Sequence, residues 1–104
     1  MGTVSKEIED YLKDYHRSEA TAIKASELGT LFNVKGKPLR DEINLLRQEG
    51  SPICSSWFGY WYSTDPADVD KTIKQLESRV THISRAINGL RMSAGGLKDE
   101  SRIE

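Results

Sequence analysis

Five side chains between positions 35 and 47 have the types and spacing that suit hydrogen bonding to nucleic acid. They are Lys35, Lys37, Arg40, Asn44 and Arg47. An arginine can donate two hydrogen bonds to the edge of guanine, and an asparagine can pair in the same two-point manner with adenine. Lysine and arginine also neutralise phosphates. By residue type, Arg40 and Asn44 suit base edges, and Lys35, Lys37 and Arg47 suit phosphates.

The charge of the whole chain does not favour nucleic acid, because the 104 residues carry a formal net charge of −1. The charge is unevenly spread, however. Residues 1–15 hold two lysines against four carboxylates, a net charge of −2, whereas residues 35–47 hold four cations against two carboxylates, a net charge of +2. A nearly neutral protein has to bind phosphates with such a local patch. The alternative is that Arg40 and Arg47 only pair with Asp41, Glu42 or Glu49 on a solvated helix face.

Two short helices separated by a tight turn are expected to carry these residues. The first spans Ser26 to Phe32, with Ser26 as its N-cap and three apolar residues pointing inward: Leu28, Leu31 and Phe32. Residues 33–36 break it, since Asn and Gly tolerate the positive φ of a tight turn. The second helix starts near Pro38 and runs to about Glu49, where Gly50 can supply a left-handed residue. Its inner face is Leu39, Ile43 and Leu46.

A helix and a hairpin complete the predicted unit. Residues 3–15 carry an apolar stripe at helical spacing: Val4, Ile8, Tyr11, Leu12 and Tyr15. Residues 16–21 are polar and indicate a loop in which His16 is solvated, and residues 22–24 predict a short strand. Two β-prone runs, 52–55 and 60–63, flank a turn at 56–59 and predict a hairpin. Tyr60 and Tyr62 are expected to face the core with Ile53, and Trp61 to face the other way.

This order of elements resembles a known family. Residues 26–34 (SELGTLFNV) resemble the first helix and turn of bacterial winged helix-turn-helix domains. Residues 39–53, followed by Gly59-Tyr60-Trp61-Tyr62, are similar to the recognition helix and wing of the biotin-repressor-type DNA-binding domain and of small phage and prophage helix-turn-helix proteins. The resemblance covers about residues 5–64 and implies no ligase activity. Gly29 stands where the family often has Ala, which costs about 1 kcal/mol of helix propensity.

The resemblance implies a helix laid in the major groove of double-stranded DNA, with the wing on the backbone or in the minor groove. The DNA-binding residues are then expected to be Lys35, Lys37, Arg40, Asn44, Arg47, Ser55, Ser56 and Trp57. Two adjacent aromatic residues, Trp57 and Phe58, at the tip of a wing are unusual because exposed aromatics lower solubility. We expect at least one of them to fold back onto the core or the last helix. The alternatives are a minor-groove wedge and a protein contact.

The rest of the chain predicts one long helix, from about Asp65 to Ser93, with Thr64 or Asp65 as its cap and Pro66 just inside its start. Its apolar residues repeat with spacings of four and three, as in a coiled coil: Val69, Ile73, Leu76, Val80, Ile83, Ile87 and Leu90. They predict a homodimer interface, although the first two turns could pack on the wing. The β-branched a positions, Ile73, Val80 and Ile87, favour a parallel two-stranded coil, and an antiparallel pair is the alternative. We expect Gly95-Gly96 to end the helix. The predicted organisation is a domain at 1–64, the helix at 65–94 and a disordered tail at 95–104.

Other classes of function find little support in the sequence. Cys54 is the single cysteine and is expected to act as a small buried apolar residue in a cytoplasmic protein. No metal-binding, cofactor-binding or nucleophile motif appears, and no transmembrane segment. The predicted fold is mainly α with a small β-hairpin, a winged helix-turn-helix plus a long C-terminal helix. The predicted function is sequence-specific DNA binding without enzymatic activity, as in a phage or bacterial transcription regulator or a replication or recombination accessory. The alternative is a winged-helix module that binds another protein.

Overall fold

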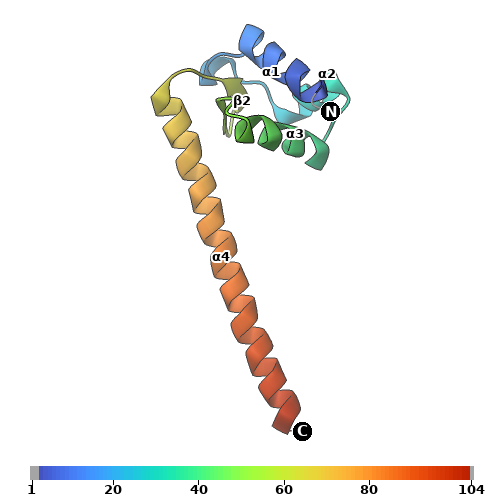
Figure 1. Ribbon diagram of the computed structural model, residues 1–104, viewed down its shortest axis with the longest axis vertical. Helices are drawn as coiled ribbons and strands as arrows, with labels where there is room; N and C mark the ends of the chain where they lie inside the picture. The colour runs from blue at the N-terminus through green and yellow to red at the C-terminus, as the bar shows by residue number, and fades with distance from the viewer. Residues whose placement is uncertain (1–2, 104) are drawn as a thin grey trace. The chain divides into compact units, whose positions relative to one another are not determined.

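The computed structural model describes residues 3–103, with side chains from Val4 to Gly95. Its helices and strands follow one another in the order α1 (Thr3–Tyr15), the 3₁₀ turn η1 (Glu19–Thr21), α2 (Ala25–Phe32), α3 (Lys37–Gln48), β1 (Ile53–Ser56), β2 (Gly59–Tyr62) and α4 (Pro66–Ile103) (Figure 1). This mainly helical architecture, with a two-stranded antiparallel hairpin and a long C-terminal helix, confirms the predicted fold class. The chain divides into two compact units, Met1–Thr72 and Ile73–Glu104, which we describe separately.

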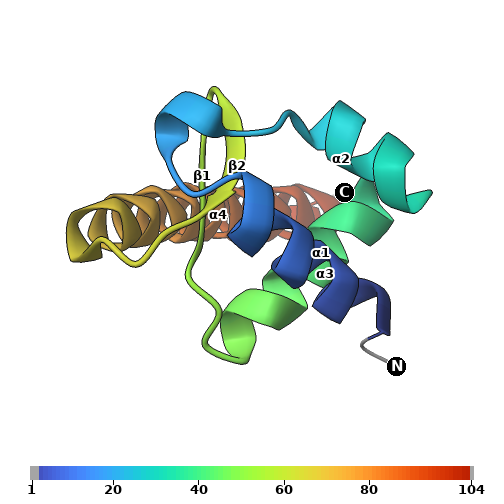
Figure 2. The same cartoon turned by 90° about the horizontal axis from the view of Figure 1, so that it is seen from above.

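The core of the first unit lies where α1 packs on α3 and the hairpin (Figure 2). It is built from the apolar stripes that the helical spacing predicts. Ile8 and Leu12 come from α1, and Leu28 from α2. From α3 come the three predicted inner residues, Leu39, Ile43 and Leu46. Three residues expected to face inward are instead exposed, namely Val4, Tyr15 and Leu31. They lie at the margins of stripes that are wider than this small core can cover.

The turn between α2 and α3 depends on residues with positive φ, as predicted. Asn33 (φ 55°) ends α2 in the left-handed conformation, and Gly36 (φ 69°) precedes α3. Helix α2 begins one residue earlier than predicted, with Lys24 at the cap position in place of Ser26. Gly29 has a role that helix propensity does not reveal. A Cβ at this position would lie 2.7 Å from the carbonyl oxygen of Val34, so the turn packs directly on the glycine.

The hairpin pairs Ile53 with Tyr62 and leaves Trp57 and Phe58 in a two-residue turn. The predicted strand at 22–24 is reduced to a single bridge between Ile23 and Tyr60, with two backbone hydrogen bonds of 2.8 and 2.9 Å. Gly59 makes this close approach possible. Its φ is 127°, and a Cβ there would lie 2.1 Å from the carbonyl oxygen of Ile23, so no other residue fits without movement of the backbone.

Both faces of the hairpin are covered. Tyr60 and Tyr62 pack against the core, whereas Cys54 and Trp61, paired across the strands, are buried on the opposite face. The first turns of α4 contact that face. Trp61 Nε1 donates to Asp68 (3.2 Å), and Thr72 Oγ1 accepts from the backbone of Ser55 (3.4 Å). The compact unit therefore reaches Thr72, beyond the boundary expected at residue 64. Burial raises the pKa of the Cys54 thiol, which keeps it protonated.

Helix α4 begins as predicted, with Pro66 in its first position and the Asp65 carboxylate accepting a hydrogen bond from the N–H of Ala67. It does not end at Gly95-Gly96. The helix continues to Ile103, so the expected disordered tail at 95–104 is wrong as far as the structure describes it, and Glu104 lies outside the described residues. Glycine lowers helix propensity by about 1 kcal/mol but does not block the helical hydrogen bonds, as proline would. Within residues 3–103, no helix has the length and apolar character needed to cross a membrane.

Candidate nucleic-acid interface

Helix α3 has one buried face and one open face. Leu39, Ile43 and Leu46 point into the core, while the predicted DNA-binding residues Lys35, Lys37, Arg40 and Asn44 are all exposed within the first unit. The structure therefore brings four of the predicted residues together on one surface, formed by the first eight residues of α3 and the turn before it. We call these four residues the α3 patch. Three are cationic, and the fourth can both donate and accept hydrogen bonds.

Polar contacts with α1 help to fix the position of α3 in the first unit. Ser5, which is buried, donates to the carboxylate of Glu42. Glu42 therefore points towards α1, whereas the alternative drawn from the sequence paired it with a neighbouring arginine. Its hydrogen-bond partner comes from a helix distant in sequence, which no local pattern could show. The consequence is that Glu42 does not neutralise the α3 patch by an ion pair.

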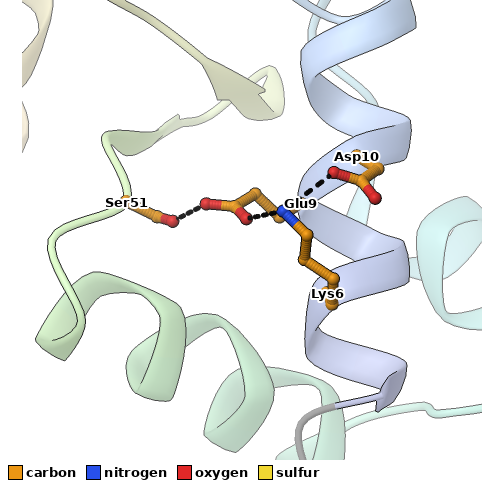
Figure 3. A network of polar contacts seen from close by, with 4 residues as sticks. All are labelled: Lys6, Glu9, Asp10 and Ser51. Carbon is orange, nitrogen blue, oxygen red and sulfur yellow. Dashed lines mark hydrogen bonds and ion pairs between the residues drawn. The ribbon is translucent and has the colours of Figure 1, made fainter.

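A second contact with α1 holds the segment that follows α3. Glu9 accepts a hydrogen bond from Ser51 and forms an ion pair with Lys6 (3.2 Å), which also contacts Asp10 (3.3 Å) (Figure 3). The Ser51 hydroxyl, and to a lesser degree Lys6, hold the pKa of Glu9 below its usual value against the opposing effect of burial. Because α1 contacts the middle of α3 through Glu42 and the segment after α3 through Ser51, the open face of α3 has a fixed orientation in the unit.

The acidic residue that lies beside the α3 patch is Asp41. Its carboxylate lies 2.9 Å from Lys37 Nζ, one helical turn away, and both side chains are largely exposed. Exposed pairs of this kind contribute at most about 1 kcal/mol, so a phosphate could replace the carboxylate as the partner of Lys37. The side chain of Arg40 has no hydrogen bond or ion pair with any residue that the structure describes. Its guanidinium is thus open for an external ligand.

Arg47 is less exposed than the residues of the α3 patch, and its side chain has hydrogen-bond partners in the hairpin. It is half-buried, and it donates through Nε to the carbonyl oxygen of Ile53 (2.8 Å) and through a terminal nitrogen to Ser55 Oγ (3.0 Å). Ser56 Oγ accepts from the backbone of Phe58 (3.1 Å). These three predicted DNA-binding residues have partners inside the hairpin. Arg47 joins the end of α3 to strand β1, which is a positioning role.

The two aromatic residues at the hairpin turn do not fold back as expected. Trp57 is 89% exposed and Phe58 is 59% exposed. Tyr60 and Tyr62 already fill the hairpin positions that pack against the core. The short turn that carries Trp57 and Phe58 is left outside the core. The prediction that at least one of the pair packs on the core or the last helix is therefore wrong.

Lys24 lies beside the exposed hairpin turn, a position that the sequence did not reveal. Its Nζ donates to the carbonyl oxygen of Trp57 (2.9 Å) and lies 5.9 Å from the centre of the indole ring. The two residues are brought together by the Ile23–Tyr60 bridge, which sets the start of α2 beside the hairpin. A lysine at the end of a predicted strand is the local signal for Lys24, and it does not identify the partner. Lys24 adds a cation next to the exposed indole.

Neither His16 nor a set of possible metal ligands forms a further site among the described side chains. His16 is half-buried and stacks near Tyr11, with Nδ1 beside the carbonyl oxygen of Thr21, so the expectation of a solvated residue is wrong. Among the described side chains, no group of three His, Cys, Asp or Glu residues is arranged to hold a metal ion. Searches with family models, against curated proteins and against solved structures found no match to this chain.

Proposed function

We propose that this protein binds double-stranded DNA through the α3 patch, with the hairpin on the neighbouring backbone. The observation that carries the proposal is the open face of α3, where Lys35, Lys37, Arg40 and Asn44 are exposed together on a helix whose other face is buried. A helix of this size fits the major groove, and its N-terminal residues are those that commonly reach base edges in helix-turn-helix proteins.

Each residue has a chemical role in the proposal. Arg40 and Asn44 contact base edges, because their two-point hydrogen bonding suits guanine and adenine. Lys35 and Lys37 bind phosphates and fix the register of the helix on the duplex. Lys24 binds phosphate beside the hairpin turn. Arg47 and Ser55 hold the hairpin at a fixed distance from α3 and act indirectly.

The mechanism is occupation of a site, without chemistry on the DNA. Such a protein regulates transcription by blocking or recruiting other factors, or assists replication or recombination by marking a site, as small phage and bacterial DNA-binding proteins do. The binding energy from about three phosphate contacts per subunit is small, since non-specific affinity grows with the number of phosphates neutralised. Stable occupation of one site would then need base contacts or a second subunit.

A fluorescence-anisotropy titration against duplex DNA at several salt concentrations tests the proposal. Three phosphate contacts predict a slope of about −3 for log K against log salt. Arg40→Ala should weaken binding to the preferred duplex by roughly 5- to 150-fold, the value of about 1–3 kcal/mol for one two-point base contact. Arg85→Ala, which removes an exposed arginine from α4, is the matched control and should bind like the parent protein. Salt-independent binding, or equal effects of the two substitutions, would overturn the proposal.

The exposed aromatic residues favour a second candidate function, recognition of another protein. Trp57 and Phe58 form an apolar tip on a chain whose net charge is −1, and aromatic side chains are common at the centres of protein interfaces. Trp57→Ala distinguishes the two candidates. A DNA-binding protein loses only the contribution of the hairpin tip, whereas a protein-binding module loses its partner and shows no affinity for duplex DNA.

A further inference from the structure

Among the described residues of the second unit, no element covers the apolar stripe of α4. In the second unit, Ile73, Val80, Ile83, Ile87 and Leu90 are between 42% and 70% exposed. Leu76, on the same stripe, is half-buried. The spacings of three and four residues make Ile73, Val80 and Ile87 the a positions of a heptad repeat, and Leu76, Ile83 and Leu90 the d positions. The remaining helix faces are predominantly polar, so the stripe is narrow and suits one partner helix.

We propose that this stripe packs against the same stripe of a second copy of the chain in an antiparallel coiled coil. The choice of orientation comes from the charges beside the stripe, at the e positions of the heptad. Asp70 and Glu77 occupy the first two, Ser84 the middle one, and Arg91 the next. The sequence places a lysine at the following e position, 98. The charge therefore changes from negative to positive along one edge of the helix.

An antiparallel arrangement makes use of this change of sign, because it sets e positions of one helix beside e positions of the other. Glu77 of each copy then lies beside Arg91 of the other, with Ser84 at the two-fold axis. Charged residues at these edges set orientation in coiled coils. With Ser84 near the two-fold axis, the central apolar layers pair Val80 with Leu90 and Ile83 with Ile87 of the other copy. The midpoint of the whole stripe, between Ile73 and Leu90, lies about three residues before Ser84, so this overlap aligns the charges with the central layers of the stripe.

A parallel arrangement makes no such pairs. It sets each e position beside a g position of the partner helix, and the g positions of this repeat are Thr72, Arg79, Ala86 and Ser93. Glu77 would face Thr72, and Arg91 would face Ala86. The charges on the e edge would then contribute nothing to the pairing.

The orientation decides where two DNA-binding units are carried. In the antiparallel pair the first residues of the two α4 helices are separated by about 50 Å, at 1.5 Å per residue on either side of Ser84. A parallel pair would start both helices at the same end. Taken with the proposed function, an antiparallel pair carries one DNA-binding unit at each end of the coiled coil. The pairing itself is independent of DNA binding and is tested without DNA.

Distances between spin labels on the full-length protein test the orientation. Single cysteines replace exposed residues on the outer face of α4, in a Cys54→Ala background: Lys71→Cys, Arg85→Cys and Met92→Cys. The antiparallel pair predicts offsets along the helix axis of about 40 Å at position 71, about 3 Å at position 85 and about 24 Å at position 92. Equal short distances at all three positions would show a parallel pair, and the absence of any distance between copies, with a monomer in sedimentation, would show that there is no pair. Either result overturns the proposal.

A charge-exchange cycle tests the contacts that set the orientation. Glu77→Arg and Arg91→Glu each place like charges opposite one another twice per dimer and should weaken dimerisation by roughly 3- to 10-fold. The double variant should recover most of the lost affinity. The two positions are about 21 Å apart on one helix, so recovery cannot come from a contact within the helix. Losses that simply add, with no recovery in the double variant, would contradict the antiparallel pairing, whether or not the protein binds DNA.

Discussion

Three apolar residues of α3 and three of α4 have the same spacing along the helix but opposite surroundings. Leu39, Ile43 and Leu46 are 1–3% exposed, whereas Ile83, Ile87 and Leu90 are 42–70% exposed. The first set is covered by α1 and the hairpin of its own unit, and the second has no covering element among the described residues of its unit. The spacing of apolar residues therefore defines an apolar face but does not specify which element covers it. In the first unit the covering is intramolecular, and in the second it is proposed to be another copy.

The largest expected contrast comes from the same glycine substitution in the two units. Gly59→Ala should lower the free energy of unfolding of the first unit by roughly 2–6 kcal/mol, because the backbone φ is unfavourable for alanine and the Cβ overlaps Ile23. Gly89→Ala, in open space on α4, should instead favour the helix by about 0.5–1 kcal/mol. Chemical denaturation followed by the fluorescence of buried Trp61 and by circular dichroism measures both. A tolerated Gly59→Ala would show that the hairpin does not sit this close to Ile23.

A smaller contrast is expected from removing equivalent apolar side chains. Ile43→Ala creates a cavity in the core and should cost about 2–5 kcal/mol of stability of the first unit. Ile87→Ala should leave that stability unchanged and weaken self-association, measured by sedimentation at several concentrations. If Ile87→Ala destabilised the first unit in a monomeric protein, the stripe of α4 would be covered by its own chain, and the contrast between the two units would be wrong.

The smallest effect concerns the ion pairs behind α3. The pKa of Glu9 is held below its usual value, so its carboxylate stabilises the folded unit above the unfolded pKa of about 4.5, and this contribution is lost as the pH falls through the lower folded value. Glu9→Gln should reduce stability near pH 6 and flatten its decline below pH 5. The matched control is Asp14→Asn, an exposed carboxylate of the same helix. Identical pH profiles for the two variants would show that the Ser51–Glu9 contact does not contribute.

Much of the first unit could be predicted because its signals are local. Asn33 and Gly36 supply the turn, Pro38 and Gly50 mark the ends of α3, and the change from helical to alternating spacing predicts the hairpin. These residues act through their own backbone preferences and immediate neighbours. The exposed members of the candidate site could be predicted for the same reason, since a helix with one apolar face turns its other face outward.

The parts that could not be predicted involve residues distant in the chain. Arg47 was assigned to phosphate, and only the packed hairpin shows that it donates to Ile53 and Ser55. Lys24 meets Trp57 across 33 positions of sequence. The burial of Trp61 beneath the start of α4 depends on the same kind of long-range packing.

The sequence alone determined the order of the main helices and the hairpin, which faces are apolar, and which cations stand together at α3 and the turn before it, because spacing and backbone preference act over a few residues. The tertiary structure decided which of those faces are covered, which cations are open to a ligand, and that the aromatic turn projects from the unit. Those outcomes depend on volume and on contacts between distant segments, which no local pattern specifies.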